Sequence, residues 1–234
     1  MPVADRLDEL ASTYRLPDGS AARLERLLSA LEAEPDPHTT VFRPEDAVDQ
    51  HIADSLSALL LAPVRAAKTL VDIGAGAGFP GLPLAVALPD AHVDLLESAR
   101  RKCAVIERLA KAADIANARA VNARAEEWAA AEGREAYDVA TARAVASLAV
   151  LVEYAAPLLK TGGAFVAWKG TPDRAEEEAG AAAAEVVGLR LVEVLNVVPF
   201  AGARALNLHL YSKVRETPDR FPRRPGAASK RPLA

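Results

Sequence analysis

The fold is decided by the stretch Val71-Asp72-Ile73-Gly74-Ala75-Gly76-Ala77-Gly78-Phe79-Pro80-Gly81. It starts within a short apolar run at 68–73, which predicts a strand, and three glycines then follow at alternate positions. Residues without a Cβ let the backbone turn tightly and approach a ligand closely, and α/β folds bind ligands at the carboxyl ends of their strands. The stretch therefore predicts a ligand-binding loop after the first strand of an α/β fold.

The rest of the chain continues this pattern, because short apolar runs alternate with helical patterns as in βαβ units and a mostly parallel sheet. Seven strands are predicted, at 68–73, 92–97, 117–122, 137–142, 163–168, 189–198 and 206–214. In the last of them leucines alternate with polar residues, as in a half-exposed strand, so we expect it to be antiparallel and near the edge of the sheet. A surface helix is expected over 172–185.

Two amphipathic helices are predicted ahead of the sheet. The first begins at Ser20 and repeats leucines every three or four residues up to Leu31, and the second begins near Pro44. The expected organisation is a helical extension at 1–66 packed on the core, a catalytic core at 67–214, and a C-terminal arm at 215–234.

The charge is distributed unevenly between the body and the C-terminal end. Residues 213–234 hold seven Lys and Arg against two Asp and Glu, a balance of 7 − 2 = +5, although the whole chain has a formal net charge of −4. Clustered cations favour binding to a polyanion because binding releases counterions. The arm, rich in proline, arginine and glycine, is expected to be extended; it either contacts a polyanionic partner or is a solvated tail.

Composition excludes several classes of protein. The 234 residues are 51% hydrophobic and 26% charged, as in an ordinary globular domain, and the single cysteine, Cys103, cannot form an intrachain disulfide. The N-terminus has no apolar run of the kind that a signal peptide needs, and the longest nearly apolar stretch, at 55–64, is about half of a membrane span. We therefore expect a cytoplasmic protein with no membrane segment and no metal.

The glycine loop has two interpretations. Gly76 to Gly81 match the dinucleotide pattern G-x-G-x-x-G, and Glu97 lies about 20 residues on, so a nicotinamide oxidoreductase is one. Three alternate glycines behind Asp72 are instead typical of S-adenosylmethionine binding, and Pro80 and Pro83 disturb the helix start that a pyrophosphate needs. We favour S-adenosylmethionine, with Glu97 accepting from the ribose hydroxyls.

Two further strand ends contribute candidates. Ala125 and Glu126 follow the third strand, where an adenine would lie, although acids there also suit an ordinary helix start. Arg143 ends the fourth strand, the position nearest the transferred methyl group. No Asn/Asp-Pro-Pro-aromatic motif for methylating an exocyclic amine and no cysteine for attacking a pyrimidine ring accompany it.

From about His38 onward the chain resembles the RsmG (GidB) family of bacterial small-subunit rRNA methyltransferases. The motifs that carry the resemblance are His51-Ile52-Ala53-Asp54-Ser55-Leu56, the glycine stretch quoted above, Thr141-Ala142-Arg143-Ala144, Trp168-Lys169-Gly170 and Phe221-Pro222-Arg223-Arg224-Pro225-Gly226. The chain departs from the family at Gln50, where an arginine is usual, and in the Asn-Leu-Thr stretch, which is His38-Thr39-Thr40-Val41 here.

The resemblance implies a class I, Rossmann-like methyltransferase that uses S-adenosylmethionine to methylate N7 of a guanine in 16S rRNA (position 527, in the 530 loop), as naked RNA or in a small-subunit particle. A non-catalytic module that binds S-adenosylmethionine and RNA is the remaining alternative. Together, motif positions and resemblance give the cofactor-binding candidates Gly74, Gly76, Gly78, Phe79, Glu97, Ser98, Ala99, Ala125, Glu126 and Arg143. Arg143 is also the catalytic candidate, and the RNA-binding candidates are His51, Lys169, Arg223 and Arg224.

Overall fold

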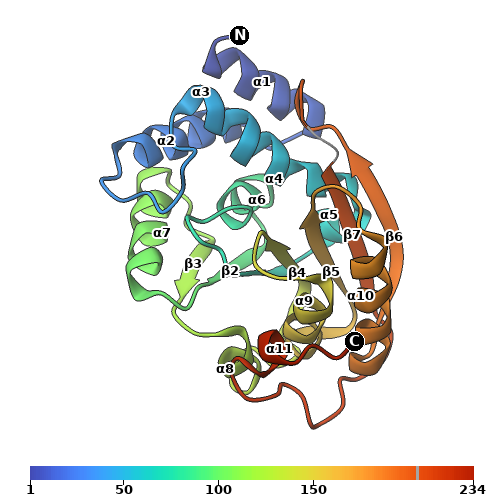
Figure 1. Ribbon diagram of the computed structural model, residues 1–234. Helices are drawn as coiled ribbons and strands as arrows, with labels where there is room; N and C mark the ends of the chain where they lie inside the picture. The colour runs from blue at the N-terminus through green and yellow to red at the C-terminus, as the bar shows by residue number, and fades with distance from the viewer. Residues whose placement is uncertain (204–205) are drawn as a thin grey trace.

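A computed structural model describes residues 1–203 and 206–234, and its centre is one seven-stranded sheet (Figure 1). The strand order is β3-β2-β1-β4-β5-β7-β6, with β7 antiparallel to both of its neighbours and the first five strands parallel. The strands are β1 (Thr69–Ile73), β2 (His92–Leu96), β3 (Ala118–Val121), β4 (Tyr137–Arg143), β5 (Leu159–Lys169), β6 (Leu189–Val197) and β7 (Leu206–Lys213). The predicted α/β class, with seven strands and an antiparallel last strand, is confirmed.

Helices cover both faces of the sheet, and each face has its own apolar core. One face is covered by α1 (Val3–Tyr14), α2 (Ser20–Ala33), α3 (Pro44–Ala47), the π-helix η1 (Val48–Ala53), α4 (Asp54–Leu56), the 3-10 helix η2 (Ser57–Leu60), α5 (Ala62–Ala66), α6 (Gly81–Ala87) and α7 (Arg100–Ala112). The other is covered by α8 (Ala125–Ala129), α9 (Leu148–Ala155), the 3-10 helix η3 (Ala156–Leu158) and α10 (Arg174–Val187). The short α11 (Ala227–Lys230) lies beside α9 near the C-terminus (Figure 1).

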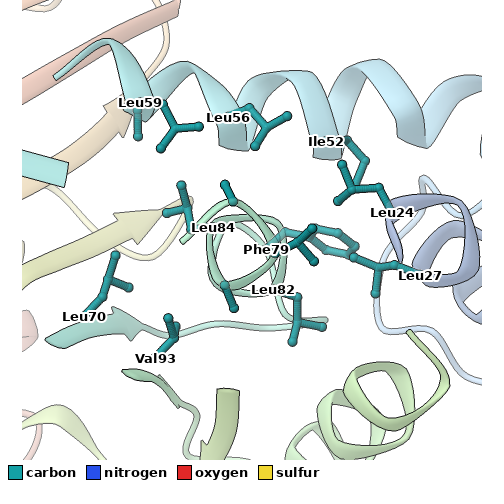
Figure 2. Packing of buried hydrophobic residues seen from close by; sticks show 14 of the residues in the cluster. Leu24, Leu27, Ile52, Leu56, Leu59, Leu70, Phe79, Leu82, Leu84 and Val93 are labelled. Carbon is teal, nitrogen blue, oxygen red and sulfur yellow. The ribbon is translucent and has the colours of Figure 1, made fainter. Parts of the chain in front are cut away.

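The N-terminal helices pack directly on the sheet layer. Figure 2 shows Ile52, Leu56 and Leu59 along one side of the second helical segment, facing α6 and the aromatic ring of Phe79. The chain runs from α3 through η1 and α4 to η2, so the helix predicted near Pro44 contains one π-helical stretch. Such stretches often occur at functional sites, and this one carries His51 beside the end of β4.

Helix α1 has no counterpart among the sequence expectations. Most of its residues are charged or small, and its apolar face consists mainly of Leu7, Leu10 and Tyr14, which are buried. The helix packs on α2. A pattern with so few apolar positions is weak in the sequence and becomes stable through its partner helix.

Strand β7 corrects one expectation. It lies next to the edge strand, between β5 and β6, as expected, but it is not half-exposed, because its polar residues Asn207 and His209 are as buried as Leu208 and Leu210. Both find partners, since Asn207 Nδ2 donates to the carbonyl of Gly170 (2.6 Å) and His209 Nε2 lies 3.1 Å from Glu177 Oε1. The alternation of polar and apolar residues thus reflects two buried faces of different chemistry, not one exposed face.

The C-terminal arm is packed, which corrects the expectation of an extended segment. Phe221 is fully buried in the core on the α9 side, and Ala228 in α11 is buried as well. Lys213, counted among the cations of this end, is buried and donates to Glu135 Oε1 (2.9 Å) and two carbonyls. Arg223 likewise pairs with Glu153. Two of the seven cations, Lys213 and Arg223, are therefore engaged in ion pairs with other parts of the chain.

Candidate functional site

The glycine loop after β1 is held by Asp72, a buried carboxylate at the centre of the sheet. Its Oδ2 accepts from the backbone N–H of Gly81 (2.9 Å) and its Oδ1 accepts from the hydroxyl of Thr141 on β4 (2.9 Å). Burial raises the pKa of Asp72 to about 7. Asp72, at the start of the loop, thus joins the end of the loop at Gly81 to the neighbouring strand β4, and each of its oxygens already accepts one hydrogen bond.

Glu97 links this loop to the end of β2. One carboxylate oxygen accepts from the N–H of Gly76 (3.2 Å), and the other accepts from the N–H of Ala99 (2.8 Å). Gly76 has a left-handed φ of 59°, and a Cβ built there would face open space, with only a carbonyl oxygen at 3.9 Å. The loop is therefore shaped so that its backbone, without side chains, borders the space beside Glu97.

A cavity of about 350 Å³ lies at this edge of the sheet. Among the cofactor candidates it is lined by Gly74, Glu97, Ser98, Ala125 and Glu126. The other wall comes from Ala144–Ala146 after β4, from Tyr154 on α9 and from Ser229 on α11. The volume is at the lower end of those typical of small-molecule sites.

The remaining cofactor candidates do not line this cavity. Gly76 and Ala99 contact the carboxylate of Glu97 through their N–H groups, Gly78 packs against Leu82, and the ring of Phe79 is buried on the N-terminal side. They belong to the loop or contact its Glu97 anchor, but they are not among the lining residues of the cavity. Arg143 lies on the far side of Ala144, in a second cavity.

The donor set of the first cavity fits S-adenosylmethionine. Glu97 is an acidic group of the kind that accepts from ribose hydroxyls, Ala125 and Glu126 line the same cavity, and Gly74 lines it without a side chain. The carboxylate of Glu126 is buried, and its Oε1 accepts from the N–H of Gly226 (2.8 Å). The cavity therefore has two acidic side chains, Glu97 and Glu126, among its lining residues.

Arg143 is fixed by the π-helical stretch. Its Nη1 donates to Asp54 Oδ2 (2.6 Å) and to the carbonyl of Gln50 (3.2 Å), and its Nη2 lies 3.2 Å from His51 Nδ1. Burial raises the pKa of Asp54, and the charge of Arg143 acts in the opposite direction. The guanidinium is thus held in one orientation by residues 89 to 93 positions away in the sequence.

The contacts of His51 determine its charge and tautomer. Its Nε2 lies 2.9 Å from the carbonyl of Val41, so this nitrogen carries the proton and Nδ1 is free to accept from Arg143. Burial and the nearby charge of Arg143 lower the pKa of His51 to about 4, so the ring is neutral. The ring also stacks on Phe79 at 4.4 Å between centroids. An RNA contact through either nitrogen would have to break one of these bonds.

The second cavity, of about 280 Å³, lies on the other side of Ala144. It is lined by Asp54, Arg143, Ala144, Trp168, Lys169, Gly170 and Leu206. Trp168 Nε1 donates to the carbonyl of Asp54 (3.2 Å), which joins the end of β5 to the helical extension. Ala144, a non-glycine residue with a left-handed φ of 57°, is the residue that borders both cavities.

The other RNA-binding candidates have different environments. Lys169 borders the second cavity, and its Nζ lies 2.6 Å from Glu176 Oε1. Arg223 donates through two nitrogens to the buried carboxylate of Glu153, whereas Arg224 is exposed. Of these three cations, only Arg224 extends into solvent without an ion pair within the part of the chain that is described.

Sequence reasoning missed Tyr154 and Ser229 as lining residues of the first cavity, and Asp54 as the partner of Arg143. The motif that contains Asp54 was visible, but its partner lies on a distant strand. Over residues 1–203 and 206–234, no group of three or more His, Cys, Asp or Glu side chains is arranged to hold a metal. No helix in those ranges is long and apolar enough to cross a membrane.

The fold resembles solved methyltransferase structures. Fibrillarin of Aeropyrum pernix in complex with S-adenosyl-L-methionine has a TM-score of 0.54 at 17% identity, over 68% of this chain and 72% of that one. The antibiotic-resistance methyltransferase Kmr has a TM-score of 0.51 at 19% identity, over 68% of this chain and 93% of that one. At these identities the likeness concerns the fold alone.

Sequence relatives are much closer. Ribosomal RNA small subunit methyltransferase G of Rubrobacter xylanophilus is 44% identical over 194 residues, which cover 81% of this chain and 74% of the relative. The protein of the same name from Pelotomaculum thermopropionicum is 41% identical over 199 residues, 83% of this chain and 82% of the relative. Residues 38–206 match the family described as rRNA small subunit methyltransferase G (GidB). The chain therefore belongs to this family and is an S-adenosylmethionine-dependent methyltransferase.

Proposed function

We infer that this chain methylates N7 of a guanine in small-subunit rRNA, with the base held in the second cavity. The observation that carries this proposal is the pair of cavities that share Ala144 at the end of β4. A base in one and the cofactor in the other would meet across this residue, where Val145 supplies an apolar rim.

The acceptor atom is inferred from the groups that border the second cavity. Guanine N7 carries a free lone pair at neutral pH, so its attack on a methyl group needs orientation but no general base. Asp54 and Lys169 are the candidates for proton transfer there, and both are engaged in ion pairs. This environment suits N7 better than an exocyclic amine, which must lose a proton.

Arg143 has the role of positioning the base. Three contacts hold its guanidinium to the helical extension. Two of its hydrogens, the one on Nε and one of those on Nη2, have no acceptor among the described residues. Arginine donors commonly bind guanine O6, which lies beside N7 on the same edge. When bound, S-adenosylmethionine supplies an electrophilic methyl group, and Arg143 would keep N7 aligned with it.

The RNA is inferred to reach the site as a loop whose target base is unstacked, since a base within a helix could not enter a cavity of this kind. Exposed cations of the C-terminal arm such as Arg224 would add phosphate contacts. The proposed substrate is 16S rRNA, as naked RNA or in a small-subunit particle, and the proposed location of the reaction is the cytoplasm.

A labelled-methyl assay tests this function. The chain is incubated with S-adenosyl[methyl-³H]methionine and small-subunit rRNA, or with small-subunit particles, with large-subunit rRNA as the control. We expect label in small-subunit RNA only, recovered as 7-methylguanosine after digestion. Cofactor binding without any transfer would favour the non-catalytic module, and tighter binding of NADH than of adenosylhomocysteine would favour the oxidoreductase.

The loop makes a separate prediction. Replacing Gly76 with valine places a branched side chain at a left-handed φ, on the residue whose N–H holds the carboxylate of Glu97, so adenosylhomocysteine affinity measured by calorimetry should fall about tenfold or more. The matched control is Gly162→Val in β5, because Gly162 also has a left-handed φ of 87° with no atom within 4 Å of a Cβ. Gly162 lies outside both cavities. Equal affinity loss in both variants would contradict the role of the loop.

A further inference from the structure

The C-terminal arm is anchored to α9 by a buried ion pair. Arg223 donates to both carboxylate oxygens of Glu153, and its Nη2 also donates to the carbonyl of Arg231 (2.8 Å). The side chain of Glu153 is only 2% exposed. A buried carboxylate left without its partner is costly, so this pair favours the packed position of the arm.

A second set of contacts holds the arm next to the first cavity. The N–H of Gly226 donates to Glu126 Oε1 (2.8 Å), and Ser229 Oγ lies 2.9 Å from the hydroxyl of Tyr154. The cavity is lined by all three side chains, those of Glu126, Tyr154 and Ser229. Glu126 belongs to the end of the cavity that we assign to the adenine base. The arm thus touches the cavity wall on two sides and contributes one lining residue of its own.

The arm also orients Glu126. With Oε1 taken by Gly226, the carboxylate has one oxygen, Oε2, that no hydrogen bond within the described residues occupies. Oε2 is not among the buried polar atoms that lack a partner, so it keeps contact with open space. Glu126 lines the cavity, so an Oε2 that faces it would accept from an exocyclic amino group of a base.

We propose that residues 226–229 form the outer wall of the adenine end of the cofactor site, so that the cofactor binds fully only when the arm is packed. Ser229 closes the wall with Tyr154, and Gly226 holds Glu126 toward the base. The anchor at Glu153 then contributes to cofactor affinity without touching the cofactor. Coupling of this kind is reciprocal, so the cofactor must also stabilise the packed arm.

The test compares two tryptophan substitutions on α11. Ser229→Trp puts a large side chain on a residue that lines the cavity, whereas Lys230→Trp puts the same bulk on the next residue, which is exposed like Ser229 but does not line the cavity. Calorimetry with adenosylhomocysteine should show an affinity loss of about tenfold or more for Ser229→Trp and less than about twofold for Lys230→Trp. Near-equal melting temperatures of the two variants without ligand show that both are folded.

Hydrogen exchange of the unmodified chain gives the second readout. Adenosylhomocysteine should slow exchange of the amides of Gly226 and Lys230, while amides in the first turn of α1, which is remote from the cavity, should change little. The proposal requires both results. It is overturned if Ser229→Trp binds like the unmodified chain, if Lys230→Trp loses as much affinity, or if the arm amides are unaffected by the ligand. No RNA is present in these experiments, so their failure leaves the proposed rRNA acceptor untouched.

Discussion

Replacing Arg143 with alanine is expected to slow methyl transfer by about 100-fold or more, because a small displacement of the base from the methyl group is costly. Adenosylhomocysteine affinity should change little, since Arg143 lines the second cavity and not the first. The rate is measured by single-turnover transfer of labelled methyl groups to small-subunit rRNA, and the affinity by calorimetry.

The same substitution has a structural cost that must be separated from its effect on the reaction. Without Arg143, the carboxylate of Asp54 remains buried and unpaired, which should lower the free energy of unfolding by about 3–5 kcal/mol. The double variant Asp54→Asn with Arg143→Gln removes both charges and should recover most of that stability. If it is stable and still slow, the guanidinium acts on the reaction. If it transfers methyl groups at the original rate, Arg143 has only a structural role.

Local patterns were sufficient to predict the sheet and the cofactor loop. Strand β1, Asp72 and the glycines after it lie within one short stretch, and Glu97 ends the next strand, so the geometry of a parallel sheet brings them together. Gly74, Glu97, Ser98, Ala125 and Glu126 do line one cavity, as expected of a cofactor site. Their roles in binding await the calorimetry described above.

The contacts that could not be predicted all join distant parts of the chain. Asp54 and Arg143 are 89 residues apart, and neither residue alone signals the other. The arm was expected to be extended because prolines and cations dominate it, yet one aromatic residue, Phe221, and one buried acid, Glu153, are enough to pack it. In β7 the polar residues suggested exposure, but their buried partners come from α10 and the β5 end. Tertiary partners, rather than local propensity, decide such cases.

These distant contacts also show that the helical extension contributes to the second cavity. His51 and Asp54 hold Arg143 from the π-helical stretch, and Trp168 connects the end of β5 to the same stretch. The second cavity is therefore built from the extension and the sheet together. The same helical segment is fixed on the sheet layer by Ile52 and Leu56, which pack over α6 (Figure 2).

The identity of the atom that receives the methyl group leads to the other large effect. Replacing the target guanine by 7-deazaguanine in a synthetic small-subunit rRNA fragment should abolish methyl transfer, because the attacking lone pair is absent. RNA affinity should stay within about twofold, since O6 and the Watson–Crick edge that a protein can bind are unchanged. Transfer is measured with labelled cofactor, and affinity by fluorescence anisotropy of the labelled fragment.

A matched control distinguishes loss of the nucleophile from loss of binding. A second fragment carries 7-deazaguanine at a neighbouring guanine and retains the normal target, and it should be methylated at the original rate. Proton transfer at an exocyclic amine would leave the 7-deaza target active, because its amino group is intact. If that target is methylated at a rate near that of guanine, N7 is excluded as the acceptor. The reaction would then require a general base, and Asp54 could act as one only after its ion pair with Arg143 breaks. If the 7-deaza target is inactive and its affinity is unchanged, the reaction depends on orienting the N7 lone pair. This result agrees with the structure, because Asp54 and Lys169 are both held in ion pairs.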